Sequence, residues 1–146
     1  DGLLRGTFVG HPMHPIMAYS SVGLWTSAVF LDVTGGDSAA ARRLLGAGLV
    51  TAPTALVTGW ATWSTLSAEQ RRVGLIHAST NAVALALFTA SYRRRAKTAD
   101  ASPPDTTSKA LALAGFAVAG LGGALGGHLG YNMGAGVAAR ALPAGV

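Results

Sequence analysis

The sequence predicts an all-α protein, an integral membrane bundle of four helices. Half of its 146 residues are hydrophobic and only 12% are charged, whereas soluble domains are about a quarter charged. It contains 20 glycines, a residue commoner in membrane helices than in soluble ones. Four apolar segments, each about 20 residues long, match the length that a helix needs to cross a bilayer. Residues 1–146 are therefore expected to form a single transmembrane domain.

The first two helices are expected at residues 15–33 and 39–65. Pro15 suits the first turn of a helix, where its missing N–H has no partner to lose. The segment TGGD, residues 34–37, ends the first helix. Pro53 lies in the middle of the second helix and predicts a kink there.

The third and fourth helices are expected at residues 73–92 and 110–131. Ser67, in the segment LSAEQRR, is a suitable N-cap for the third helix. Residues 93–109 are polar and contain prolines, so they are predicted to form a mobile loop. A glycine-broken tail follows the fourth helix.

Basic residues predict how the bundle is oriented in the membrane. Four spans place both termini and the loop between helices two and three on one side. The other side carries seven basic residues against four, so the positive-inside rule puts the other two loops in the cytoplasm. Both termini of this multi-pass inner (cytoplasmic) membrane protein are then expected outside. The outer basic residues are Arg5, Arg71, Arg72 and Arg140; the inner ones are Arg42, Arg43, Arg93, Arg94, Arg95, Lys97 and Lys109.

The histidines are predicted to lie in one layer near the outer ends of the helices. Two of them start the first helix, one lies a few residues into the third, and one lies near the end of the fourth. At 1.5 Å per residue, His77 and His128 fall about 5–10 Å inside the outer boundary. Polar side chains inside a bilayer are costly and usually mark function. The candidate site residues are His11, His14, His77, Asn81, His128, Tyr131 and Trp63.

Helical periodicity assigns the polar residues to faces. On the third helix His77 and Asn81 share one stripe with residues 84, 88 and 91, and on the first helix His14 shares one with residues 21, 25 and 32. The fourth helix has a glycine face that includes Gly126 and allows close helix packing, and His128 points away from it. Threonines on the second helix are expected to bond their own helix's carbonyls.

Three kinds of chemistry fit such a histidine layer. Histidine can hydrogen-bond a quinone carbonyl and pass on its proton. Two histidines on facing helices, here His77 and His128, can be axial ligands of haem b. Histidines can also bind a transition metal directly. The chain has no cysteine, so it holds no iron–sulfur cluster of its own, and no serine–histidine–aspartate spacing favours nucleophilic hydrolysis.

Three segments carry recognisable motifs: GHPMHP, LIHASTNAVALALF and GGALGGHLGYNMGAGV. Together they resemble the four-helix membrane family known as domain of unknown function 2231, over essentially the whole chain. The resemblance implies an association with Rieske-type iron–sulfur domains and, for some members, a role as membrane subunits of actinobacterial succinate dehydrogenases. The matching residues are His11, Pro12, His14, Pro15, His77, Asn81, Gly127, His128, Tyr131 and Gly134.

These observations lead us to expect a membrane-anchor subunit of a quinone-linked respiratory oxidoreductase of the succinate dehydrogenase type. It would bind a quinone, menaquinone in this expectation, and would not be catalytic alone. Its partners would be membrane lipid, a flavoprotein, an iron–sulfur subunit and a Rieske-type membrane subunit. Nucleic acid is not expected, because the basic residues flank apolar segments. The alternatives are a haem b cytochrome and a structural or metal-sensing membrane protein.

Overall fold

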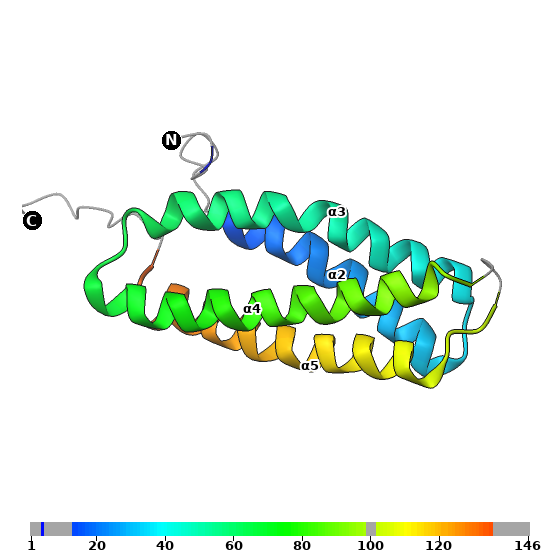
Figure 1. Ribbon diagram of the computed structural model, residues 1–146. Helices are drawn as coiled ribbons and strands as arrows, with labels where there is room; N and C mark the ends of the chain where they lie inside the picture. Colours follow the sequence, from blue (N-terminus) through cyan, green and yellow to red (C-terminus); the bar gives the residue numbers. More distant parts are fainter. Residues whose placement is uncertain (1–3, 5–12, 99–101, 136–146) are drawn as a thin grey trace, which may run out of the picture.

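The computed structural model describes Leu4, residues 13–98 and residues 102–135, and it is a bundle of four helices (Figure 1). Every helix is long and apolar enough to span a membrane, and the described residues include no strand. The fold is therefore the expected all-α membrane bundle. Its helices are α2 (Met13–Thr34), α3 (Ser38–Trp63), α4 (Ala68–Arg95) and α5 (Thr106–Gly127), the last followed by a π-helical turn (His128–Asn132).

Side-chain caps fix where the helices begin. Ser67 caps α4 as predicted, and Gln70 completes the capping box by accepting from the Ser67 backbone N–H at 2.9 Å. The Asp37 carboxylate accepts hydrogen bonds from backbone N–H groups at the start of α3, and the Asp105 carboxylate does so at the start of α5. The Asp105 cap starts α5 four residues before its expected first residue.

The structure corrects the expected loop at residues 93–109. α4 continues three residues beyond residue 92, to Arg95, and α5 begins at Thr106, so both ends of this segment are helical. The charged sequence resembles a loop, but the Arg95 side chain turns into the bundle, where Asp32 neutralises it. The ion pair with Asp32 thus extends α4 into a segment whose charged composition predicts a loop.

The bundle consists of two antiparallel hairpins, α2 with α3 and α4 with α5 (Figure 1). Within each hairpin a large ring packs against a glycine of the second helix. Trp25 lies over Gly48 in the first hairpin, and Phe88 lies over Gly115 in the second. Both glycines are buried. A Cβ atom at Gly48 would displace the Trp25 ring, and one at Gly115 would pack tightly against the Phe88 ring, so close packing of each hairpin depends on the two glycines.

Three residue pairs join α2 of one hairpin to α4 of the other, and the members of each pair are 63 residues apart. The His14 and His77 rings meet near one end, and Trp25 stacks on Phe88 with centroids 4.4 Å apart further along. Near the opposite end Asp32 pairs with Arg95. Each pair occupies equivalent positions in the two hairpins, so the hairpins are arranged as repeats about an approximate two-fold axis along the bundle.

The outer surface of the bundle is apolar. Phe30, Val50 and Leu121 are more than half exposed, as are several other large hydrophobic side chains. A monomeric soluble protein of this size rarely exposes such a large apolar surface to water. The hydrocarbon core of a bilayer is the solvent that suits it.

Candidate functional site

His77 on α4 is held against α5 by a backbone hydrogen bond and by a glycine. Its Nδ1 lies 2.8 Å from the carbonyl oxygen of Gly122. A Cβ atom at Gly126, one turn further along α5, would lie only 2.9 Å from the His77 Cε1 atom. The missing side chain therefore makes room for the imidazole ring.

His14 on α2 is held against α3 in the same way. Its Nδ1 lies 2.9 Å from the carbonyl oxygen of Ala55. One turn further along α3, a Cβ atom at Gly59 would lie 3.0 Å from the His14 ring. Each hairpin thus presents one histidine through the same device, a carbonyl at one position and a glycine four residues later.

These hydrogen bonds fix which ring nitrogen carries the proton. A carbonyl oxygen can only accept, so Nδ1 of each neutral histidine must be its protonated nitrogen. The Nε2 atom then carries a lone pair and can accept a proton or coordinate a metal. The two rings have centroids 6.1 Å apart and planes at 86°. The geometry therefore brings two oriented imidazoles together at the seam between the hairpins.

Asn81, one turn beyond His77 on α4, lies beside this pair. Its Nδ2 donates to the His77 backbone carbonyl at 2.9 Å and lies 3.3 Å from both nitrogens of the His77 ring. A donor on the lone-pair axis of Nε2 would be much farther from Nδ1, so the amide does not occupy that axis. Gly122 gives the Asn81 side chain its room, since a Cβ atom there would lie 2.5 Å from Oδ1.

The other predicted site residues are not joined to this pair. His128 is exposed at the end of α5 and hydrogen-bonds Asn132 at 3.1 Å, and Tyr131 is 88% exposed. Trp63 packs against Gly74 at the start of α4. His11 lies outside the described residues. The ring that faces His77 is therefore His14, and not the haem partner expected from the sequence, His128.

The comparisons with known proteins identify a family. Residues 10–139 match the family described as "Predicted membrane protein (DUF2231)". The chain belongs to the DUF2231 family. No curated protein and no solved structure matches it.

The histidine motifs of this DUF2231 protein gave no indication of two features, a buried ion pair at the end of the bundle opposite the histidines and a glycine beneath His14. Asp32 and Arg95 form an ion pair whose side chains are only 6% and 3% exposed. The Arg95 Nη1 donates to the Asp32 Oδ1 at 2.8 Å, and the Arg95 Nε donates to the Ser91 hydroxyl at 3.2 Å. The other feature is Gly59, the glycine beneath the His14 ring. The spacing of His14 and Asp32, repeated in His77 and Arg95, is the signal that could have indicated the ion pair.

No group of three or more metal-binding side chains occurs among the residues of this DUF2231 protein that the structure describes. The two oriented imidazoles are thus its most distinctive polar feature within the membrane span. Each neutral imidazole has an Nε2 lone pair that can accept a proton from a bound ligand or coordinate a metal ion.

Proposed function

We propose that this DUF2231 protein is a membrane-anchor subunit of a quinone-linked respiratory oxidoreductase of the succinate dehydrogenase type, and that it binds menaquinone at the His14–His77 pair. The observation that carries the proposal is the pair itself: two imidazoles whose Nδ1 atoms are engaged by backbone carbonyls and whose Nε2 atoms have lone pairs. The flavoprotein, iron–sulfur and Rieske-type partners would supply the electrons, because this chain contains no cysteine.

The chemistry of a quinone suits such a pair. Reducing a quinone to a quinol adds two electrons from a partner subunit and two protons, one on each oxygen. A protonated imidazole can donate Nε2–H to a quinone oxygen, and a neutral one can accept the proton of a quinol hydroxyl at the same atom. Because the ring centroids are only 6.1 Å apart, both imidazoles would lie against the same quinone head group.

The Trp25–Phe88 stack supports a site at one end of the bundle. The two rings lie about 16 Å further along the helices, at 1.5 Å for each of 11 residues. They are nearly parallel, at 19°, and largely buried. They close the seam between the hairpins, so protons would reach the histidines from the end where α2 begins.

The test measures quinone reduction per assembled complex after replacing single histidines. His77→Ala and His14→Ala should assemble normally and lose about a hundredfold in turnover, the size of a typical general acid–base contribution. His128→Ala is the matched control and should keep normal turnover. Normal turnover in assembled His77→Ala and His14→Ala complexes would refute the proposal. A large loss of turnover in His128→Ala would show that the site also includes His128, as the sequence predicts.

A haem b cytochrome is the second candidate, in which His14 and His77 would hold the haem iron. The observation in its favour is the hydrogen bond from each Nδ1–H to a backbone carbonyl, the usual way in which proteins orient a metal-binding histidine. When bound, the haem would supply one-electron transfer. The absorption spectrum separates the two candidates: a Soret band that disappears in His77→Ala favours the haem, and its absence from the purified wild-type complex favours the quinone.

A further inference from the structure

A cleft lies between α3 and α4 at the end of the bundle opposite the histidines. Its volume is about 380 Å³. Along α3 its lining changes from charged to apolar, beginning with Arg42 and Arg43 and ending with Leu49 and Val50. Tyr92 contributes the α4 side. One end of this cleft is thus suited to an anion and the other to hydrocarbon.

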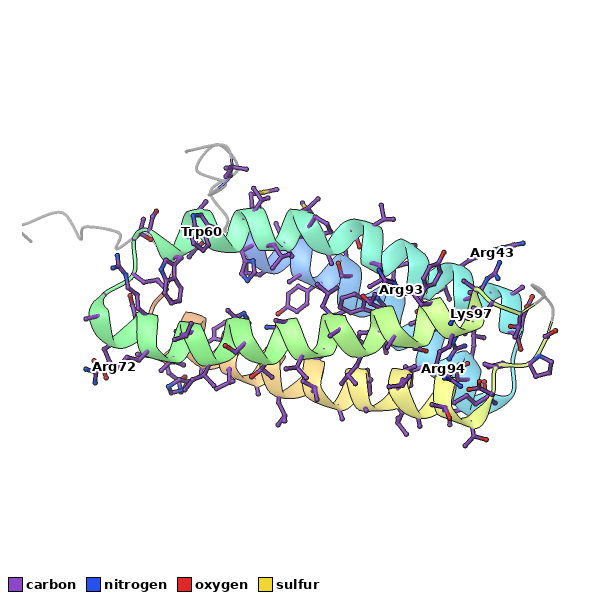
Figure 2. The ribbon with its side chains drawn as sticks, viewed as in Figure 1. Arg43, Trp60, Arg72, Arg93, Arg94 and Lys97 are labelled. Atoms are coloured by element: carbon purple, nitrogen blue, oxygen red, sulfur yellow. The ribbon has the colours of Figure 1, made fainter. Side chains whose placement is uncertain are left out.

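Positive charge gathers around the charged end of the cleft. Figure 2 shows Arg43, Arg93 and Lys97 at the same end of the bundle, far from Arg72. All three are exposed, and none pairs with a carboxylate of any residue that the structure describes. The nearby Arg94 differs because Asp105 neutralises it at 2.9 Å. The cleft therefore opens beside a group of exposed basic side chains.

The depth of the cleft matches the boundary of a bilayer. α3 has 26 residues and is about 39 Å long, against a hydrocarbon core of about 30 Å. About three residues at each end then extend beyond the core. Arg42 and Arg43, the fifth and sixth residues of α3, lie close to that boundary, where long arginine side chains reach the headgroups. Val50 lies two turns deeper, among acyl chains.

We infer that this cleft binds an anionic phospholipid, with its phosphate on Arg42 and Arg43 and an acyl chain along the apolar part of α3. Arginine suits a phosphate because its planar guanidinium donates two parallel hydrogen bonds. Basic pockets between transmembrane helices bind anionic headgroups in this way. A lipid fits better than a free phosphate, because half of the lining is apolar and lies at acyl depth.

Gly46 and Tyr92 shape the floor of the cleft. A Cβ atom at Gly46 would lie 2.9 Å from the Tyr92 ring, so the glycine lets that ring lean against α3. The Tyr92 hydroxyl has no hydrogen bond to any residue within the described part of the chain. It is available to the glycerol or ester oxygens of a lipid.

The test compares lipid binding by the full-length protein in detergent, measured by native mass spectrometry. Cardiolipin and phosphatidylglycerol should bind, and phosphatidylcholine should not. The variant Arg42→Gln/Arg43→Gln should bind cardiolipin about 25-fold more weakly, at about fivefold for each arginine. The single variant Arg43→Gln changes only an exposed side chain, so it tests the site without risk to folding, and it should lose about fivefold.

The matched control is Arg71→Gln/Arg72→Gln, which removes two exposed arginines from the start of α4. It should bind cardiolipin as the wild type does. Equal losses in both double variants would overturn the inference by showing that only overall charge matters. Equal binding of phosphatidylcholine would also overturn it, as would full displacement of cardiolipin by millimolar inorganic phosphate, which would indicate a plain anion site.

Discussion

Two glycines decide how closely the histidines approach the neighbouring helices. Gly59 and Gly126 lie directly beneath the imidazoles of His14 and His77. Gly123 of α5 has no such role, since a Cβ atom there would meet nothing within 4 Å. The two types of glycine on one helix therefore predict substitutions with opposite effects.

Gly126→Ala should destabilise the protein by about 1–3 kcal/mol, because the new methyl group displaces the His77 ring from a packed position. Gly126→Leu should prevent normal assembly. Gly123→Ala is the control and should be neutral or stabilising by up to about 1 kcal/mol, as alanine favours a helix. Thermal unfolding in detergent measures both. Equal stability of the two alanine variants would show that α5 does not pack on His77 through Gly126.

The sequence allowed part of this site to be predicted. Helical spacing correctly placed His77 and Asn81 on an inward stripe, and residues 84, 88 and 91 of that stripe are buried. The threonine hydroxyls of α3 bond their own carbonyls as expected, for example Thr62 to Thr58 at 3.1 Å. The partner of His77 was not predictable, because depth in the membrane does not define how the helices are rotated about their axes.

The end of α4 and the start of α5 are held by buried polar contacts that amino-acid composition does not predict. The sequence predicts that Arg95 lies in a loop, but its side chain is buried beside Asp32, which is 63 residues away in the sequence. The Ser91 hydroxyl receives one of its hydrogen bonds, and Ser91 in turn donates to the Ser108 carbonyl at 2.7 Å on α5. A contact over such a distance in sequence leaves no local pattern.

Asp32→Ala should cost about 3–5 kcal/mol in unfolding free energy, because it leaves the Arg95 guanidinium buried without its carboxylate. The double variant Asp32→Ala/Arg95→Met should recover most of that loss, since it removes both charges. Arg94→Ala is the control: it breaks an ion pair whose side chains are 47% and 54% exposed, and it should have little effect. A double variant as unstable as Asp32→Ala would contradict the expected gain.

Asp105 makes the start of α5 sensitive to acid. The hydrogen bond from the Ser108 backbone N–H, with that from Arg94, lowers the pKa of Asp105 from 3.8 to about 2. A lowered pKa means that the cap stabilises the folded state fully above about pH 4 and loses this effect as the pH falls toward 2. Amide exchange in the first turn of α5 should therefore accelerate across this window.

Asp105→Asn is the control for the acid sensitivity of α5. Asparagine is also a good N-cap, but its side chain does not titrate. The variant should keep the helix and lose the change in amide exchange between pH 4 and pH 2. A change of the same size in Asp105→Asn would assign the acid effect to another group.

The number of spanning helices can be predicted from the hydropathy and length of the apolar segments, without knowledge of any single contact. Four apolar segments correctly predicted four spanning helices, because a bilayer demands a fixed length of apolar helix. Hydropathy did not indicate that the helices form two repeated hairpins. That arrangement rests on glycines, ring stacking and an ion pair, which have no common hydropathy signature.

The orientation of the bundle remains a prediction that single cysteines can test, since the chain has none of its own. Ser102→Cys lies between α4 and α5, and Ser64→Cys lies between α3 and α4; both positions are exposed. A membrane-impermeant maleimide added to intact cells should label Ser64→Cys and leave Ser102→Cys unlabelled. The reverse pattern would invert the topology and leave the arrangement of the histidines unchanged.

The Asp32–Arg95 pair shows what the chain gains from carrying both hairpins. In a homodimer of one hairpin, each equivalent position would meet its own copy, and an aspartate would face an aspartate or an arginine an arginine. Either pairing would bury two like charges. A single chain escapes that constraint, because its two halves can diverge separately: it keeps the identical histidines at one level and places an acid opposite a base at another. Covalent linkage thus permits a chemical asymmetry that a symmetric dimer cannot have.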